Sequence, residues 1–226
     1  MIRTNCFKSS STYEFKRHLG VGGCAEVALF NKKAEGLPDQ EVVLKIIKTS
    51  SPEVVKELIN DGEKLGQLKH PHIVSTFGYE RLAGDRVALV LEYIRGTNLK
   101  MIIETLTDGD RPAAAALVLS TISDALQFAH EHGIIHGDIS ARNILVSDLG
   151  KIKLSDFGLA TKGNGSVLDG RPFKASPDYL APEQWLGTQP TAAADVFALG
   201  ILAYEILTGV NPLRGVPPRQ IQKTLN

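Results

Sequence analysis

Cysteine is scarce in this sequence, which holds only Cys6 and Cys24 among 226 residues. Two cysteines without C-x-x-C spacing exclude a disulfide scaffold and are typical of a reducing compartment. We therefore expect two free thiols in a cytoplasmic protein.

An excess of charge of either sign is also missing, because 25 Lys and Arg residues balance 25 Asp and Glu residues. This balance provides no long-range field for nucleic acid, so we expect none as a partner. The longest apolar run, residues 196–207, is interrupted by Gly200 and Glu205, and residues 1–5 have no apolar signal segment. We therefore expect no membrane contact within this chain.

What the sequence does have is enough apolar residues, 43%, for one large core or two modest ones. Residues 1–12 are polar and serine-rich and are expected to form a flexible leader. Apolar stretches bounded by turn residues predict strands, and stretches of helical periodicity predict helices. The expected strands are 15–19, 25–31, 41–47, 73–79 and 87–93, and the expected helices are 52–67, 112–132 and 194–208.

The chemistry is concentrated between residues 136 and 158. Asp138 and Asn143 lie on one loop, and Asp156 follows a short predicted hairpin that folds the chain back toward them. Magnesium prefers hard oxygen ligands and keeps several waters, so two oxygen donors plus substrate phosphates are enough to hold it. The segment therefore predicts a metal and phosphate site with a further carboxylate for proton transfer.

These residues resemble the catalytic loop of eukaryotic-like protein kinases, H-R-D-L-x-x-x-N, and the D-F-G segment that follows it. The resemblance implies ATP and Mg²⁺ as cofactors and a protein as substrate. It also implies that Asp138 accepts the proton of the acceptor hydroxyl and that Asn143 and Asp156 bind the metal. Lys45 would bind the phosphates as the V-A-I-K lysine, and Arg142 would add positive charge near the γ-phosphate.

The segment Gly20-x-Gly22-x-x-Ala25-x-Val27 resembles the kinase Gly-rich loop, with Ala25 in place of the third glycine. By resemblance, the backbones of Glu92 and Ile94 would bind adenine. The full set implied for the nucleotide is Leu19, Gly20, Gly22, Gly23, Val27, Val43, Lys45, Leu91, Glu92, Ile94, Asn98, Leu145 and Asp156.

The resemblance also implies a bilobal fold, with a small antiparallel N-lobe sheet and one main helix over 13–93, and a mostly helical C-lobe over 94–226. The last C-lobe helices would be absent from the domain over 13–226. A missing segment or a partner would then cover the exposed C-lobe face. Asp195 is expected to anchor the backbone of the catalytic loop.

The acceptor class is indicated by two segments that disagree. The loop Asp-x-x-x-Arg-Asn is similar to that of many tyrosine kinases, whereas residues 176–183 resemble the T-P-x-Y-x-A-P-E segment of serine/threonine kinases. We favour serine/threonine specificity, of the bacterial type, because the second segment shapes the floor for the acceptor. A tyrosine or dual-specificity kinase is the alternative.

Three departures from the family pattern leave a pseudokinase or signalling scaffold open as another alternative. Asp61 stands where the helix glutamate would pair with Lys45, and its side chain is about 1.5 Å shorter. Either the helix would have to lie closer to Lys45, or Glu57 or Glu63 would have to substitute. Gly137 replaces the H-R-D arginine, so we expect no need for phosphorylation between residues 158 and 175. The third departure is Ala25. The histidine pairs at 70 and 72 and at 130 and 132 are expected to be structural.

Overall fold

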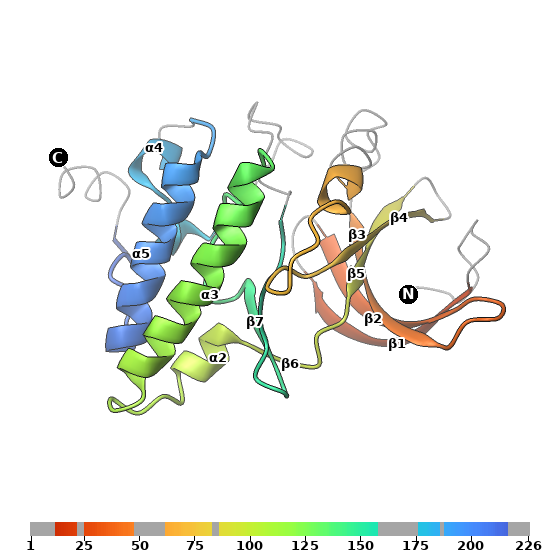
Figure 1. Cartoon of the computed structure of the whole chain (residues 1–226), viewed down its shortest axis with the longest axis horizontal. Helices are drawn as coiled ribbons and strands as arrows, with labels where there is room; N and C mark the ends of the chain where they lie inside the picture. Colours follow the sequence, from red (N-terminus) through yellow and green to blue (C-terminus); the bar gives the residue numbers. More distant parts are fainter. Residues whose placement is uncertain are drawn as a thin grey trace. The chain divides into compact units, whose positions relative to one another are not determined.

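Five antiparallel strands form the first part of this computed structural model, which describes residues 12–21, 25–47, 62–82, 86–157, 176–185 and 188–216. They are β1 (Thr12–Val21), β2 (Ala25–Lys33), β3 (Gln40–Ile47), β4 (Thr76–Arg81) and β5 (Val87–Glu92), in the spatial order β1-β2-β3-β5-β4 (Figure 1). The expected small antiparallel sheet is therefore confirmed.

The described residues divide into two compact units. The first contains the residues up to Lys69 together with Ser75–Tyr93, and the second contains His70–Val74 together with the residues from Ile94 onward.

The core of the first unit lies where strand β3 is central in the sheet. From Val42 to Ile47 every β3 residue is buried, as expected for a continuous apolar strand that is covered on both faces. The cluster of buried side chains around it is Tyr13, Ala28, Phe30, Val42, Leu44, Ile46, Leu82, Ala88 and Val90. The buried Tyr13 hydroxyl donates to Glu80 Oε1 at 2.8 Å, which satisfies its polar end.

Several boundaries differ from the sequence expectation, and the strand expected over 15–19 is longer, because β1 spans Thr12–Val21. Thr12 already belongs to β1, so the leader expected over 1–12 ends one residue too late, and residues 1–11 lie outside the described part. The strand expected over 73–79 is wrong at its start, because β4 begins at Thr76. Of the helix expected over 52–67, residues 62–67 are described. Residues 62–65 are helical and 66–67 are a turn, so the expected end is two residues too late, and the Gly66 amide donates to the Gly62 carbonyl at 2.9 Å.

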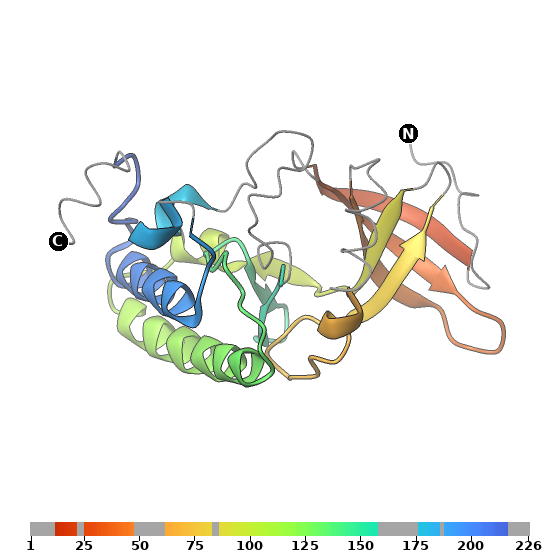
Figure 2. The same cartoon turned by 90° about the horizontal axis from the view of Figure 1, so that it is seen from above.

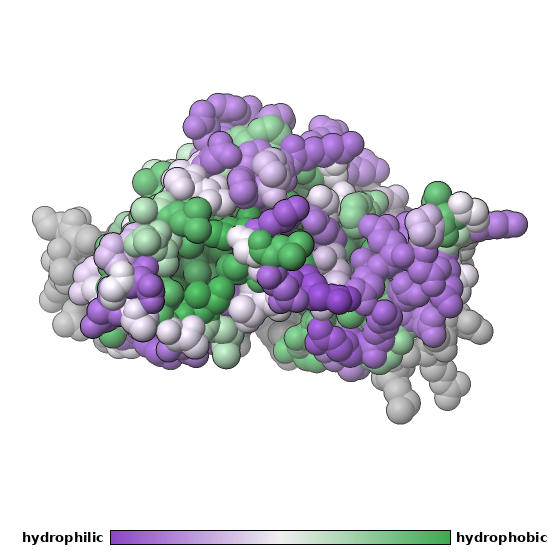
Figure 3. Space-filling view, turned by 60° about the horizontal axis from the view of Figure 1, so that its bottom comes forward, coloured by the Kyte–Doolittle hydropathy of each residue, from purple (hydrophilic) through white to green (hydrophobic). Residues whose placement is uncertain are grey.

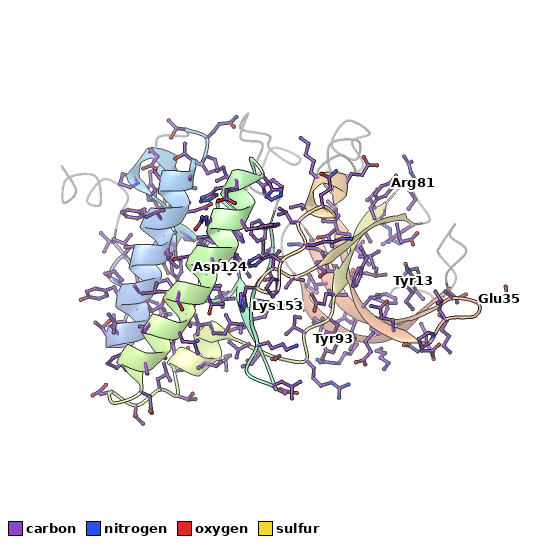
Figure 4. All side chains as sticks on the ribbon, in the orientation of Figure 1. Tyr13, Glu35, Arg81, Tyr93, Asp124 and Lys153 are labelled. Atoms are coloured by element: carbon purple, nitrogen blue, oxygen red, sulfur yellow. The ribbon has the colours of Figure 1, made fainter. Side chains whose placement is uncertain are left out.

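The segment His70–Val74 is bound to the second unit by contacts with its helix and sheet. Ile73 forms a parallel bridge with Leu154, and the Val74 amide donates to the Leu154 carbonyl at 2.9 Å. His70 Nε2 lies 3.2 Å from Asp124 Oδ2, and Lys153 Nζ donates to the Ile73 carbonyl at 3.3 Å; Figure 4 labels Asp124 and Lys153. These contacts explain why Ile73 does not continue into the first sheet.

The second unit combines a small antiparallel sheet with helices. Its sheet has the order β6-β7-β8, from β6 (Gly96–Asn98), β7 (Ile144–Ser147) and β8 (Ile152–Leu154). Its helical elements are α2 (Leu99–Ile103), α3 (Arg111–Glu131), the 3-10 turn η1 (Pro177–Tyr179), α4 (Pro182–Trp185) and α5 (Ala192–Thr208). The two long helices α3 and α5 lie side by side in both Figures 1 and 2.

Helix α3 begins with Pro112 in its first turn, where the missing amide hydrogen costs nothing. Ile122, Leu126 and Ala129 of the expected core stripe are buried, whereas Leu119 is half-exposed. By length and composition alone α3 could cross a membrane, and 33% of that window is buried here. One such helix is weak evidence for a span, because core helices of proteins that span no membrane meet the same criteria.

The outer face of α5 exposes large apolar side chains. Val196 is 63% exposed, Tyr204 51% and Leu207 48%. Figure 3 shows apolar residues gathered over part of this helical unit, while the surface of the sheet unit in the same view is mostly hydrophilic.

Candidate active site

A single buried carboxylate holds the start of the catalytic loop. Asp195, in the first turn of α5, is 1% exposed. Its Oδ2 accepts the His136 amide at 2.9 Å, and its Oδ1 accepts the Gly137 amide at 2.7 Å. The expectation that Asp195 anchors the backbone of this loop is therefore confirmed.

Two histidines surround this anchor. His130 Nε2 lies 2.8 Å from Asp195 Oδ2, a contact that the sequence reasoning missed because it assigned His130 only to the end of a helix. The Asp138 amide donates to His136 Nδ1 at 3.2 Å, so Nδ1 is an acceptor. His136 Nε2 therefore carries the proton and donates it to the Ser155 carbonyl at 2.8 Å. In this way the imidazole joins the catalytic loop to the residue before Asp156.

Asp138 and Asn143, which the sequence placed on one loop, are in direct contact. Asn143 Nδ2 lies 2.7 Å from the Asp138 carbonyl oxygen and 3.0 Å from Asp138 Oδ2. Both of these atoms are acceptors, so this side of the Asn143 amide must be its nitrogen. The Ser176 amide donates to the other carboxylate oxygen, Asp138 Oδ1, at 2.8 Å. The carboxylate is thus fixed by one donor on each oxygen, and Asn143 keeps its oxygen for another ligand.

The hairpin places Asp156 next to the residue that binds Asn143. Strands β7 and β8 pair with Ile144 opposite Leu154. The amide and the hydroxyl of Ser155 then both donate to the Asn143 carbonyl at 2.8 Å. Asp156 follows with a φ of 66°, a left-handed conformation that costs about 1–2 kcal/mol for a residue other than glycine. Such strain tends to concentrate at functional sites.

The donor set on this loop fits a magnesium ion. Asn143 and Asp156 provide an amide oxygen and a carboxylate, which are hard ligands. No cluster of three His, Cys, Asp or Glu side chains suited to a metal occurs among the described residues. A cation bound here would therefore need further oxygens from phosphate and water, which is the way magnesium is usually held.

In the first unit, several residues predicted to bind the nucleotide lie on neighbouring strands. Val27 on β2 is opposite Gly20 on β1 on one side and opposite Lys45 on β3 on the other, and Val43 is opposite Leu91 on β5. Lys45 is 7% exposed. A further predicted residue, Leu19, is exposed.

Some predicted residues lie outside the described part of the chain. These are Gly22 and Gly23 of the Gly-rich loop, and Asp61 and Glu57, two of the three proposed partners of Lys45. The third, Glu63, is described and its side chain is exposed. The pairing of Lys45 with a helix carboxylate stays a prediction.

The segment after β5 is held by short elements that the sequence reasoning did not predict. Strand β6 pairs with β7, with Asn98 opposite Leu145. Asn98 then caps α2, its Oδ1 accepting the Met101 amide at 3.2 Å. At the end of β5, the Glu92 amide donates to the Ser75 carbonyl at 2.9 Å. Ile94, which follows β5, is half-buried. The role predicted for Asn98 therefore has to coexist with its capping role.

Within residues 136–143 of the catalytic loop, Arg142 is the one exposed residue, and the others are buried or half-buried. Arg142 is exposed between the buried Ala141 and Asn143, so its charge faces solvent. Ser140, two residues after Asp138, is fully buried. That position supplies no positive charge, which leaves Arg142 as the loop's cation.

A buried network that sequence reasoning missed supports Ala141. Glu205 on α5 is 2% exposed; its Oε1 accepts Lys100 Nζ at 3.0 Å and its Oε2 accepts the Tyr179 hydroxyl. The same hydroxyl accepts the Ala141 amide at 3.4 Å. Burial, and next the hydrogen bond to Glu205, raise the pKa of Tyr179 well above its ordinary value, so the phenol stays a donor at neutral pH.

Gln184 of α4 connects the platform segment, residues 176–183, to the catalytic loop. Its Oε1 accepts the Ala181 amide at 2.9 Å, and its Nε2 donates to the Gly137 carbonyl at 3.3 Å. Gly137 itself has a φ of 75°, a conformation that glycine adopts without strain. The neighbouring Glu183 is half-buried.

Comparison with known proteins gives the same fold. The sequence profile of the protein kinase domain matches residues 13–225. Serine/threonine-protein kinase PrkC of Bacillus subtilis is 33% identical over 210 residues, which are 91% of this chain and 32% of that protein. Serine/threonine-protein kinase PknB of Mycobacterium leprae is 33% identical over 218 residues, 92% of this chain and 34% of that protein. The chain thus spans about a third of the length of these relatives.

A solved structure agrees in architecture. The crystal structure of the Mycobacterium tuberculosis PknI kinase domain superimposes with a TM-score of 0.69 at 23% identity, over 94% of this chain and 79% of that one. With an antiparallel sheet unit, a helical unit and a family match over nearly the whole sequence, this chain belongs to the protein kinase domain family and has its bilobal α+β fold.

Proposed function

We propose that this chain is the catalytic domain of an ATP- and magnesium-dependent protein kinase that transfers the γ-phosphate to serine or threonine hydroxyls of proteins. The observation that carries the proposal is the bonded pair Asp138 and Asn143, followed across the β7–β8 hairpin by the left-handed Asp156. Phosphoryl transfer requires mainly positioning and charge neutralisation. These three side chains would position the reacting groups, and the magnesium that Asn143 and Asp156 would hold would neutralise the charge.

In this proposal Asp138 binds the acceptor. Its carboxylate is already oriented by the Ser176 amide and by Asn143, each of which uses one direction on one oxygen. A carboxylate oxygen can accept a second hydrogen bond, so a substrate hydroxyl can bind Asp138 without displacing either donor. Asp138 would orient that hydroxyl and take up its proton as phosphate is transferred.

The nucleotide would be held by the other residues. Asn143 and Asp156 would bind magnesium, which neutralises phosphate charge when it is bound. Lys45 would bind the α- and β-phosphates, and Arg142 would lie near the γ-phosphate. The strands that carry Val27, Val43 and Leu91, together with the backbones after β5, would bind the nucleoside.

Serine/threonine specificity is supported by the platform segment and by the relatives. Ser176 stands at the threonine position of T-P-x-Y-x-A-P-E, and its amide donates a hydrogen bond to Asp138 Oδ1 at 2.8 Å. The relatives with about a third identity are named serine/threonine-protein kinases. We therefore propose serine and threonine as acceptors, although the Asp-x-x-x-Arg-Asn pattern of the loop favours tyrosine.

The test is transfer from γ-labelled ATP with magnesium to three peptide pools whose single acceptor is Ser, Thr or Tyr. We expect the native chain to label the Ser and Thr pools and Asp156→Ala to label neither. Asp148→Ala is the matched control, because Asp148 is exposed on the turn of the same hairpin, and it should retain activity. Labelling confined to the Tyr pool would overturn the acceptor class. No transfer by a folded chain that binds ATP would favour a signalling scaffold instead.

A further inference from the structure

The buried carboxylate of Glu205 has one donor on each oxygen, and the two donors come from different elements. Lys100 on α2 donates to Oε1 at 3.0 Å, and Tyr179 on η1 donates to Oε2. Lys100 keeps 20% of its side chain exposed and also lies 3.8 Å from Glu104 Oε1 one turn along the helix. Glu104 is 53% exposed, so Glu205 is the partner that has lost its water.

The two residues that bind Glu205 also bind Ala141, one on its carbonyl and one on its amide. The Lys100 amide donates to the Ala141 carbonyl at 3.1 Å, and the Tyr179 hydroxyl accepts the Ala141 amide at 3.4 Å. Ala141 is fully buried and lies three residues after Asp138 and two before Asn143. Glu205 is thereby connected through the Tyr179 hydroxyl to the amide of the residue at the centre of the catalytic loop, while the backbone of Lys100 holds the carbonyl of the same residue.

We propose that Lys100 is a positioning residue for the catalytic loop, acting through Glu205 and Tyr179 on Ala141. This inference rests on the proposed kinase function, since it names a residue that supports the same site. Nothing in the sequence marks Lys100, because it lies 105 residues from Glu205 and outside the resemblance motifs.

The physical reason is the charge of Glu205. With Lys100 present, the carboxylate is paired and can hold the Tyr179 hydroxyl in one orientation, with its lone pair on the Ala141 amide. Without the ammonium, Glu205 is left in a water-poor site, where Tyr179 is its remaining donor among the described residues, and it must attract water or a proton. Either response changes the bond to Tyr179 and so loosens the support of Ala141.

The experiment compares the native chain with Lys100→Met, Lys100→Arg and a control, Lys151→Met. Methionine keeps the length and apolar stem of lysine without its charge, arginine keeps the charge, and Lys151 is exposed on the β7–β8 turn. The readouts are kcat, the KM for ATP, and amide hydrogen exchange of the peptide that contains residues 138–143.

We expect Lys100→Met to lower kcat about 10- to 100-fold, the effect of a small misplacement of reacting groups, with the KM for ATP changed by less than about twofold. Exchange in the 138–143 peptide should rise about tenfold relative to peptides outside the catalytic loop. Lys100→Arg should recover most of the kcat, and Lys151→Met should match the native chain.

Either of two results would overturn the proposal. One is a Lys100→Met kcat, per folded molecule, within about twofold of native, because a merely structural lysine would lower only the folded fraction. The other is a loss of kcat without faster exchange in the 138–143 peptide. If the native chain transfers no phosphate, the proposed function fails, and the exchange data alone still decide whether Lys100 supports the loop.

Discussion

Replacing Asp195 removes the acceptor on which the start of the catalytic loop depends. In Asp195→Ala the buried amides of His136 and Gly137 lose their partner, and His130 loses its contact as well. A buried donor left unsatisfied costs about 1–3 kcal/mol, so the two amides together predict a loss of about 2–6 kcal/mol. The histidine adds less, because 20% of its side chain is exposed and it can turn to water.

The upper end of that range approaches the whole stability of a typical domain, about 5–15 kcal/mol, so the alanine variant is at risk of not folding. Asp195→Asn is the sharper test. It keeps the shape and one acceptor oxygen but sets an NH₂ group against one of the two amides. Half of the effect is expected, about 1–3 kcal/mol.

The measurement is urea unfolding of the native chain, Asp195→Asn and the exposed control Asp148→Asn, with hydrogen exchange at the His136 and Gly137 amides. We expect a lower midpoint at unchanged slope for Asp195→Asn, and faster exchange at one of the two amides. A stability within about 0.5 kcal/mol of the control, with both amides still protected, would refute the anchor.

The other predictions concern the backbone, pH and regulation. Gly96→Ala should destabilise the chain, because Gly96 has a φ of 155° and an added Cβ would lie 2.1 Å from the Val146 carbonyl oxygen of β7. Gly150→Ala is the control, because a Cβ there meets no atom within 4 Å. Urea unfolding should show that Gly96→Ala lowers the free energy of unfolding by about 1–3 kcal/mol more than Gly150→Ala does. An excess near zero would contradict the close approach. Folding raises the pKa of Tyr179, so the phenol contributes stability to the folded state that is complete below the ordinary pKa of 10.0. This contribution is lost as pH rises through the raised pKa. The difference in unfolding free energy between the native chain and Tyr179→Phe should therefore become smaller in alkali. A gap that widens above pH 10 would be inconsistent with this sign. The double variant Thr161→Ala, Ser166→Ala should keep kinase activity within about twofold, because glycine replaces the arginine that would bind a phosphorylated loop, and a complete loss in a folded variant would contradict this.

Much of the first unit could be predicted from local pattern. Strands β1, β2, β3 and β5 appear close to where apolar alternation and turn residues place them, because each packs its own apolar residues into the sheet. The start of β4 was wrong because Ile73 pairs with Leu154, and both residues belong to the second unit. Sequence pattern cannot choose between two apolar partners.

The candidate site was predicted where function constrains neighbours in sequence. Asp138, Asn143 and Asp156 come within one short stretch, and a hairpin was enough to connect them. The elements β6 and α2 were missed because they are too short to show a period and depend on pairing with β7 and on the Asn98 cap.

The supporting residues were missed for a different reason. The Lys100 contact with Glu205 spans 105 residues, that of His130 with Asp195 spans 65, and that of Gln184 with Gly137 spans 47. Such pairs have no periodic or motif signal in the sequence. The partner of a buried charge can be identified only from the fold, which brings distant residues into contact.

The central claim is a division of labour in which Asp138 binds the acceptor while Asn143 and Asp156 bind the metal nucleotide. The most direct test measures Mg·ATP affinity and single-turnover phosphate transfer on the same preparation of Asp138→Ala. We predict an affinity within about twofold of native and a transfer rate lower by about 10²–10⁴-fold. Transfer at the native rate, or equal loss of nucleotide affinity and transfer, would contradict the account.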